Sequence, residues 1–382
     1  MGFSDGAVAG SMVDVVVTGL GLWTALGATT QATWSNLLAG ESAIALRQPF
    51  QSLPPVPLAL ADKLPADPDS LLKAAVTAAL ADAGLNPPLA DCGVVVGSSR
   101  SYLNRWEAMA RGELALDHWL AALPASLSGQ VAQWVGSQGP LLAPMAACAT
   151  GLWALFQGFM LLQTGQCARV LVAAVDAPIT PLTLAGFRRM GAMATDGCYP
   201  FDCDRNGLVL GEGAAAVVLE TRGSNPGKAA YGQLLGFGLS NDAYHISSSR
   251  QDGTLTVAHQ CLQRSSLNAS DIDYIHTHGT GTRLNDTNEA YMIQQLFPQA
   301  AVSSSKGATG HTLGAAGLIG TVFSLLSLQQ QRLPPSVGLR RPEFDLNFVR
   351  CNSRHTGPID HVLCSSFGFG GQNVIVALGH AG

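Results

Sequence analysis

Short apolar segments alternate with longer segments of helical length along most of the 382 residues of this chain. Cys92–Gly97 and Val170–Val175 carry almost no polar side chains, so each predicts a strand that is apolar on both sides. Leu71–Ala83 and Gly314–Gln330 have the length and apolar content of buried helices. Because strands of this kind need cover on both faces of their sheet, the alternation predicts an α/β fold.

The same order of strands and helices recurs in the second half of the chain, for example at Tyr274–Thr277 and Asn288–Leu296. This rhythm predicts two similar α/β halves, residues 1–225 and 226–382, although no repeat is visible at the level of single residues. Amphipathic, tryptophan-containing segments over about 100–138 predict a helical insertion over the core of the first half.

Charged residues are scarce in this chain, which predicts an extensive covered surface. They make up 12% of the sequence, against 47% hydrophobic residues, so an oligomer with a large apolar interface is expected, most simply a homodimer. The net charge is −5 and no cluster of Lys and Arg is present, which argues against a nucleic-acid partner.

The cysteines and the apolar runs indicate the cellular compartment of the protein. The eight cysteines are scattered, and the spacing of Cys198 and Cys203 matches no common metal or redox motif, so a reducing cytoplasm is expected. Met1–Met12 has no basic segment before an apolar core, which argues against a secretory signal. Gly, Gln or Pro interrupts the longest apolar runs, so no membrane span is expected.

Cys148 is the candidate nucleophile. It lies in a run of small residues, Pro144–Gly151, directly before the apolar stretch Leu152–Leu162, which predicts a buried helix. The positive end of the helix dipole and unpaired backbone N–H groups would favour the thiolate there, and small neighbours leave room for an acyl group. The alternative is a cysteine that only fills the core.

Three further segments combine Gly, small residues and polar side chains: His276–Thr282, Ser303–His311 and Ser366–Gly371. Each follows a predicted strand, where sites of α/β sheets are usually found. The histidines could instead be structural, or His276 and His278 could form half of a metal site. Nucleotide binding is not expected, because the glycine-rich stretches fit no Walker motif and Gly19–Gly21 lacks the third glycine of a dinucleotide fingerprint.

Taken together, these segments resemble the β-ketoacyl-acyl-carrier-protein synthase family, the elongating condensing enzymes and polyketide ketosynthases. The likeness covers nearly the whole chain. Its motifs, in order, are Val-Thr-Gly-Leu-Gly from Val17, Ala-Cys-Ala-Thr-Gly around Cys148, Pro-Phe-Asp-Cys-Asp-Arg-Asn-Gly-Leu-Val-Leu-Gly-Glu-Gly from Pro200, His-Gly-Thr-Gly-Thr from His278, Lys-Gly-Ala-Thr-Gly-His from Lys306, and Phe-Gly-Phe-Gly-Gly from Phe367.

The resemblance implies a thiolase-like fold with a layered α-β-α-β-α core, and a decarboxylating Claisen condensation. In such enzymes an acyl chain passes from a carrier thioester to the cysteine, here Cys148. Malonyl-acyl carrier protein then loses carbon dioxide, and its carbanion attacks the acyl-cysteine to give a 3-ketoacyl thioester in fatty acid or polyketide synthesis. The family's catalytic histidines match His278 and His311, whose N–H groups would stabilise the oxyanion. The implied partner is acyl carrier protein with its phosphopantetheine, and neither a metal nor a redox cofactor is implied.

The resemblance assigns supporting roles as well. Lys306 would support the histidines electrostatically, and the backbone N–H groups of Cys148 and Phe369 would form a second oxyanion hole. Thr280 and Thr282 would hold the pantetheine arm. Phe187 and Phe369 would line the acyl pocket, and plain core packing is the alternative for both.

One departure and two rival functions remain open. Gly320 stands where long-chain members often carry an acidic partner for the lysine, nine residues after His311. The first rival is a non-catalytic chain-length factor that pairs with a true ketosynthase in a heterodimer, although such partners normally lack the cysteine. The second is a thiolase or acyltransferase without decarboxylation, for which Cys364 lacks the expected surrounding motif.

Overall fold

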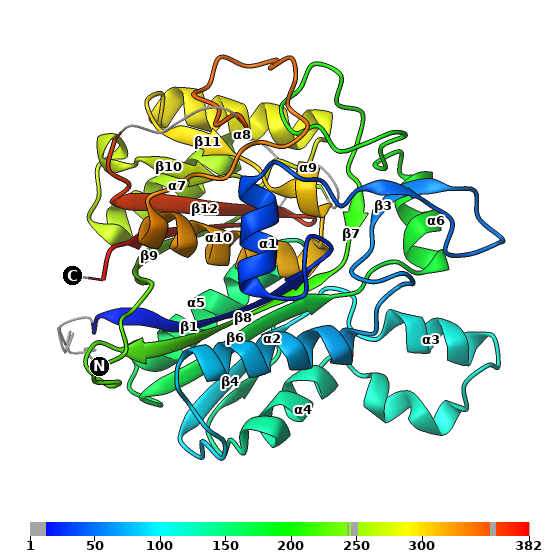
Figure 1. The fold of residues 1–382 in the computed structure, drawn as a ribbon, viewed down its shortest axis with the longest axis horizontal. Helices are drawn as coiled ribbons and strands as arrows, with labels where there is room; N and C mark the ends of the chain where they lie inside the picture. Colours follow the sequence, from blue (N-terminus) through cyan, green and yellow to red (C-terminus); the bar gives the residue numbers. More distant parts are fainter. Residues whose placement is uncertain (1–12, 243, 246–250, 352–356, 382) are drawn as a thin grey trace, which may run out of the picture.

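The computed structural model describes residues 13–242, 244–245, 251–351 and 357–381, so the predicted absence of a signal in Met1–Met12 lies outside the described residues. Ten strands form one large mixed sheet (Figure 1). In spatial order they are β11 (Ala301–Ser303), β10 (Tyr274–His276), β12 (His361–Gly368), β13 (Gln372–Gly379), β9 (Gly232–Asn241), β1 (Val15–Thr24), β8 (Gly213–Thr221), β6 (Arg169–Asp176), β4 (Cys92–Gly97) and β5 (Leu141–Leu142).

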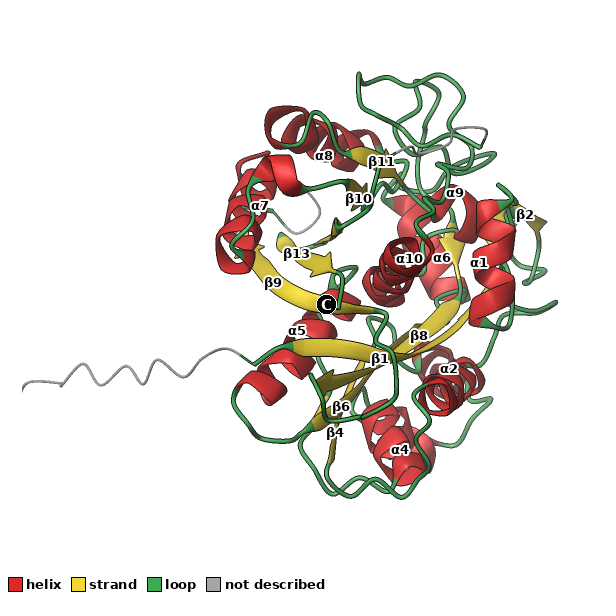
Figure 2. Ribbon diagram, turned by 60° about the vertical axis from the view of Figure 1, so that its left-hand side comes forward, coloured by secondary structure: helices red, strands yellow, loops and turns green. Residues whose placement is uncertain are grey.

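The sheet has two parts, one from β1 to β5 and one from β9 to β11 in the order given above. Three layers of helices cover these two parts (Figure 2). α2 (Pro68–Asp82) and α4 (Ser126–Val135) pack on the outer face of the β1-to-β5 part. α5 (Thr150–Gln163) and α10 (Ala316–Gln330) lie between the two parts, and α7 (Gln251–Ser265) and α8 (Arg283–Leu296) close the far side. The predicted α/β class and its α-β-α-β-α layering are therefore confirmed.

The remaining described elements are short. A small sheet contains β2 (Ala45–Arg47), β3 (Val56–Ala59) and β7 (Leu210–Gly211). The other helices are α1 (Thr30–Leu38), α3 (Leu103–Ala110), α6 (Pro181–Arg189) and α9 (Lys306–Thr309), with 3₁₀ turns η1 (Leu116–Ala122), η2 (Ala269–Asp271) and η3 (Leu313–Ala315).

The helical stretch Leu313–Gln330, which includes α10, is long and apolar enough by composition for a membrane span, with a mean hydropathy of 1.3. Glycines interrupt this stretch, as expected, but they do not bring its mean hydropathy below that of a span. Because 89% of it is buried inside the protein, against α5 and β12, it has the surroundings of a core helix.

β1 continues through Gly19 and Gly21. The strand shifts register between Val17 and Gly19 and then pairs with β8 as far as Thr24. A Cβ atom at Gly21 would lie 1.9 Å from the carbonyl oxygen of Ala75, so glycine lets α2 lie directly on the strand.

The strands of residues 15–221 and those of residues 232–379 occupy opposite ends of the sheet and meet where Val15–Val17 pairs with Gly232–Leu234. The domain boundary at residue 225 itself stays a prediction. Within the segment 100–138 the expected helices are present, and α4 belongs to the outer helical layer.

Candidate active site

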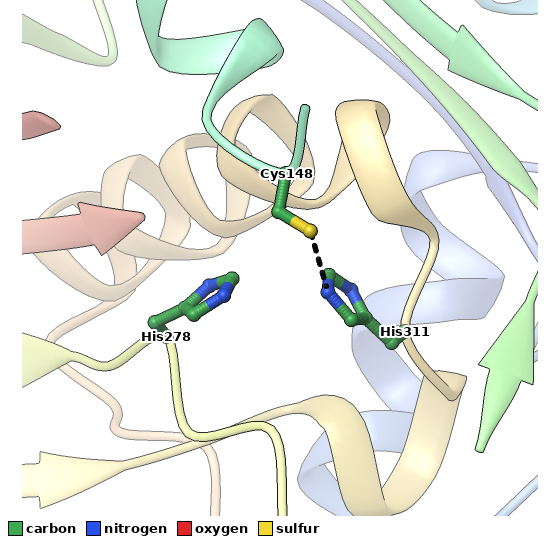
Figure 3. Close-up of side chains that lie close together, drawn as sticks. All are labelled: Cys148, His278 and His311. Atoms are coloured by element: carbon green, nitrogen blue, oxygen red, sulfur yellow. Dashed lines mark hydrogen bonds between the residues drawn. The ribbon is translucent and has the colours of Figure 1, made fainter. Parts of the chain in front are cut away.

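Cys148, His278 and His311 meet in one buried site although they come from distant parts of the chain (Figure 3). Cys148 lies just before α5, His278 follows β10, and His311 follows α9. The Nε2 atom of His311 is 3.2 Å from the Sγ atom of Cys148. The two imidazole rings meet edge to face with their centroids 5.3 Å apart, and the sulfur and ring nitrogens all lie within 4.8 Å of one another. The structure therefore brings together the three side chains that the sequence selected, while their roles stay predictions.

The backbone around Cys148 is held by contacts from both sides. Ala147 has a φ of +47°, a conformation that non-glycine residues rarely adopt and that the surroundings must enforce. The Thr150 hydroxyl donates to the Ala147 carbonyl and accepts from the Ala146 N–H, at 2.6 and 2.8 Å. Ser366 in β12 donates to the Cys148 carbonyl at 2.8 Å. Contacts from both halves of the fold therefore hold the cysteine backbone in place.

Burial determines the protonation state of Cys148, His278 and His311. Burial raises the pKa of Cys148 to about 11, although Lys306, Arg100 and the Phe369 backbone N–H act to lower it. The expected thiolate stabilisation at the helix end is therefore outweighed by desolvation. Burial, reinforced by Lys306, also holds the pKa of His311 well below 6.5, and the same causes hold down that of His278. A neutral thiol and two neutral imidazoles are the resting forms near pH 7.

Lys306 and Glu289 support the loop that carries His278. The Lys306 ammonium donates to the His278 carbonyl; burial lowers its pKa, and the charge of Glu289 opposes that shift. Glu289 in α8 accepts from the backbone N–H groups of His278 and Gly279, both at 2.8 Å, and from the Ser365 hydroxyl at 2.6 Å. Glu289 was not predicted as a site residue, because its only signal in the sequence is an acidic residue on a predicted helix, and its complete burial is visible only in the fold.

His276 occupies the space beside Gly320. A Cβ atom at Gly320 would lie 2.7 Å from the Nδ1 atom of His276, so this imidazole stands where a side chain at position 320 would project. Its Nε2 atom is 3.2 Å from the Ser305 hydroxyl. Burial and the charge of Lys306 lower its pKa to about 3, so the acidic group expected here is replaced by a neutral ring.

The alternative of a metal half-site at His276 and His278 was wrong for His276. His276 faces Ser305 and the Cys364 sulfur, 3.9 Å from its Nδ1 atom, whereas His278 groups with Cys148 and His311. All eight cysteines are free thiols, and Cys364 lies buried within β12.

Cys148 lines two cavities. The first, here called the threonine cavity, is also lined by His278, His311, Thr280 and Thr282. The second, called the arginine cavity, is also lined by Ser99, Arg100, Met145, Ala147, Leu313 and Gln372. Phe187 and Phe369 line both, with their rings stacked at a centroid distance of 6.2 Å. The two phenylalanines therefore stand between the cavities.

α6 carries Phe187. Pro181 at its first turn and the Thr180 hydroxyl, which accepts from the Thr183 N–H at 3.2 Å, start this helix. The helix buries the Phe187 ring, which is 3% exposed, while Phe369 is 36% exposed.

Comparisons with known proteins agree with this geometry. Residues 65–224 match the family described as "Beta-ketoacyl synthase, N-terminal domain", and residues 231–340 match "Beta-ketoacyl synthase, C-terminal domain". The 3-oxoacyl-[acyl-carrier-protein] synthase 2 of Rhizobium meliloti (strain 1021) is 32% identical over 96% of this chain and 99% of its own length.

Solved structures share the whole fold. The ishigamide ketosynthase/chain length factor is 26% identical, with a TM-score of 0.87 over 97% of this chain and 100% of its own. A chain from a type II polyketide synthase acyl-carrier protein in complex with its ketosynthase bound to the hexaketide is 23% identical, with a TM-score of 0.89 over 97% of this chain and 100% of its own.

Proposed function

This chain belongs to the β-ketoacyl synthase family, and from that premise we propose that it condenses an acyl thioester with malonyl-acyl carrier protein to give a 3-ketoacyl thioester. It is an acyltransferase of the condensing class, in fatty acid or polyketide synthesis. The observation that carries the proposed mechanism is the contact of 3.2 Å between Cys148 Sγ and His311 Nε2, with His278 beside both.

In the first step the acyl group moves from its carrier to Cys148. Neutral His311 accepts the thiol proton through Nε2, and the sulfur attacks the thioester carbonyl. The carrier thiolate leaves and takes the proton from His311, so the ring returns to its neutral form. The oxyanion formed during the attack would be held by the N–H groups of Cys148 and Phe369, the latter facing the sulfur.

In the second step the malonyl thioester loses carbon dioxide. The electron pair of the breaking bond forms an enolate. Its oxygen would accept from the imidazole N–H groups of His278 and His311, the latter in the tautomer that carries its proton on Nε2, the nitrogen that faces Cys148. The carbanion then attacks the acyl carbonyl, and the Cys148 thiolate leaves and takes up a proton from water. Because decarboxylation supplies the carbanion, the proposed steps require neither a metal nor a redox cofactor.

Acyl carrier protein is the proposed partner, with its phosphopantetheine arm in the threonine cavity. Thr280 and Thr282 line this cavity, and their hydroxyls lie 2.9 Å apart. Such hydroxyls can exchange hydrogen bonds with the amides of a pantetheine arm. Lys306, in contrast, reaches the His278 carbonyl from a buried position, which suits an electrostatic role without attack on substrate.

The two rival functions lose support from this geometry. A non-catalytic chain-length factor does not require a buried thiol in contact with an imidazole. This chain has Cys148, His278 and His311 together in one site, which favours a catalytic role. A thiolase would need a second cysteine at the reacting carbon. Cys364 lines neither cavity and instead contacts His276 and the Gly317 carbonyl.

The proposed function is tested with acyl-acyl carrier protein and malonyl-acyl carrier protein supplied together. The expected product is a 3-ketoacyl carrier two carbons longer than the starting acyl chain, with one carbon dioxide released per turnover. Mass spectrometry of the carrier identifies the product. Acyl exchange without carbon dioxide release would instead support the acyltransferase rival, and no reaction in the absence of a second subunit would support the chain-length factor.

Self-association is a further part of the proposal, with β5 as the contact. This strand ends the large sheet, so one of its edges is unpaired among the described strands, and nearby Leu141 and Met145 are 46% and 53% exposed. Light scattering is expected to show a dimer, and Leu141→Lys to weaken it by about tenfold or more. Leu64→Lys, at a site 69% exposed outside this edge, is the matched control. A monomeric wild-type chain would contradict homodimerisation and would direct the search to a related partner subunit.

A further inference from the structure

The arginine cavity differs chemically from a pocket suited to a plain hydrocarbon chain. Met145, Phe187, Leu313 and Phe369 supply apolar walls, but Arg100 and Gln372 line the same space. Cys148 lines this cavity as well, so an acyl group on its sulfur that entered the cavity would lie beside the two polar side chains.

The Arg100 side chain has no polar partner within the described part of the chain. Its Nε atom is buried without a hydrogen bond, and its guanidinium carbon lies 5.5 Å from the centre of the Phe187 ring. The charge is close enough to lower the pKa of Cys148, against the larger effect of burial. No hydrogen bond of the Gln372 amide is found among the described residues, and no acidic side chain lines the cavity.

The Asp176 carboxylate binds the Arg100 backbone and not its guanidinium. Asp176 accepts from the Arg100 N–H at 2.9 Å, from the Ser98 hydroxyl at 2.7 Å and from the Gly314 N–H at 2.6 Å. Ser101, with a φ of +49°, donates its N–H to the Ser98 hydroxyl at 2.7 Å. The turn is thus fixed, so Arg100 can bind a ligand without ordering its backbone first.

A plain methylene chain in this cavity would displace water from the guanidinium and offer no acceptor in return, which is costly. An oxygen on the chain would restore the lost hydrogen bonds. We propose that the arginine cavity selects acyl chains that carry an oxygen acceptor, a ketone or a carboxylate, and that Arg100 is the specificity-determining residue. This inference rests on the proposed function, because it assumes an acyl group on Cys148.

The test compares six-carbon chains on acyl carrier protein: hexanoyl, 3-oxohexanoyl, 5-oxohexanoyl and adipoyl. Intact-protein mass spectrometry follows loading of the full chain over time. At least one oxygenated chain is expected to load about tenfold faster than hexanoyl, as one charged hydrogen bond allows. The ketone and carboxylate arms identify which oxygen is bound.

Variants then test whether Arg100 causes the preference for oxygenated chains. Arg100→Met is expected to abolish it and to speed hexanoyl loading, whereas Arg100→Lys should retain part of the preference for adipoyl. Arg189→Met, on the exposed side of α6, is the matched control and should leave every rate unchanged. The proposal is overturned if hexanoyl loads and condenses as fast as the oxygenated chains, or if Arg100→Met keeps the wild-type preference. The former result would leave the proposed function standing, whereas failure of every acyl chain to load would remove both.

Discussion

Cys148→Ala is expected to abolish acyl-enzyme formation, a loss on the order of 10³-fold or more in acyl transfer. Cys148 lines both cavities, and its sulfur lies 3.2 Å from the imidazole that would take its proton. Alanine removes the nucleophile with little change in volume. After incubation with acyl-acyl carrier protein, intact-protein mass spectrometry should show an adduct on the wild-type chain and none on the variant.

The controls separate this role from general thiol chemistry. Cys351→Ala removes an exposed thiol and should load normally. Decarboxylation of malonyl-acyl carrier protein by Cys148→Ala should persist, because His278 and His311 remain in place. An adduct that persists in Cys148→Ala, located by peptide mapping on another cysteine, would refute the assignment of the nucleophile.

The two histidines are expected to differ when each is replaced with alanine. His311→Ala should slow both loading and decarboxylation, because its Nε2 atom contacts the sulfur and its ring lies beside that of His278, where the enolate would form. His278→Ala should slow decarboxylation and largely spare loading, because no hydrogen bond joins it to Cys148 among the described contacts. Losses of about 10²–10⁴-fold are expected for each affected step.

The two steps are measured separately for this comparison. Intact-protein mass spectrometry follows loading, and release of labelled carbon dioxide from malonyl-acyl carrier protein follows decarboxylation. His259→Ala, at an exposed position of α7, is the matched control. Equal losses in both steps for both variants would show that the imidazoles act as one unit, and the proposed division of roles would be wrong.

The layers of the fold could be predicted because each main strand and helix carries its own signal. Cys92–Gly97 was placed without error as β4, and α5 and α10 were found within a few residues. The short strands β2, β3 and β5 were missed, since strands of two to four residues carry little periodicity and depend on their partners. The strand β3 contains Pro57, a residue that is rare inside sheets.

The site residues that belong to short sequence motifs could be predicted. Those whose role depends on contacts with distant parts of the chain could not. Cys148, His278 and His311 each stand among small residues at the end of a strand or the start of a helix. Glu289 and Arg100 stand in ordinary surroundings, and only the folded chain shows that one holds the His278 loop and the other lines a cavity. The raised pKa of Cys148 also depends on burial that no local pattern reveals.

The stacked pair Phe187 and Phe369 has a consequence for the order of events. Because one entrance beside Thr280 and Thr282 would serve the pantetheine arms of both donors, the two carriers cannot be engaged together. In the proposed reaction the first carrier protein must dissociate before malonyl-acyl carrier protein binds. The acyl chain stays on Cys148 meanwhile, on the other side of the two phenylalanine rings. The enzyme would then work by a double-displacement, ping-pong cycle, because both donors would use the threonine cavity in turn.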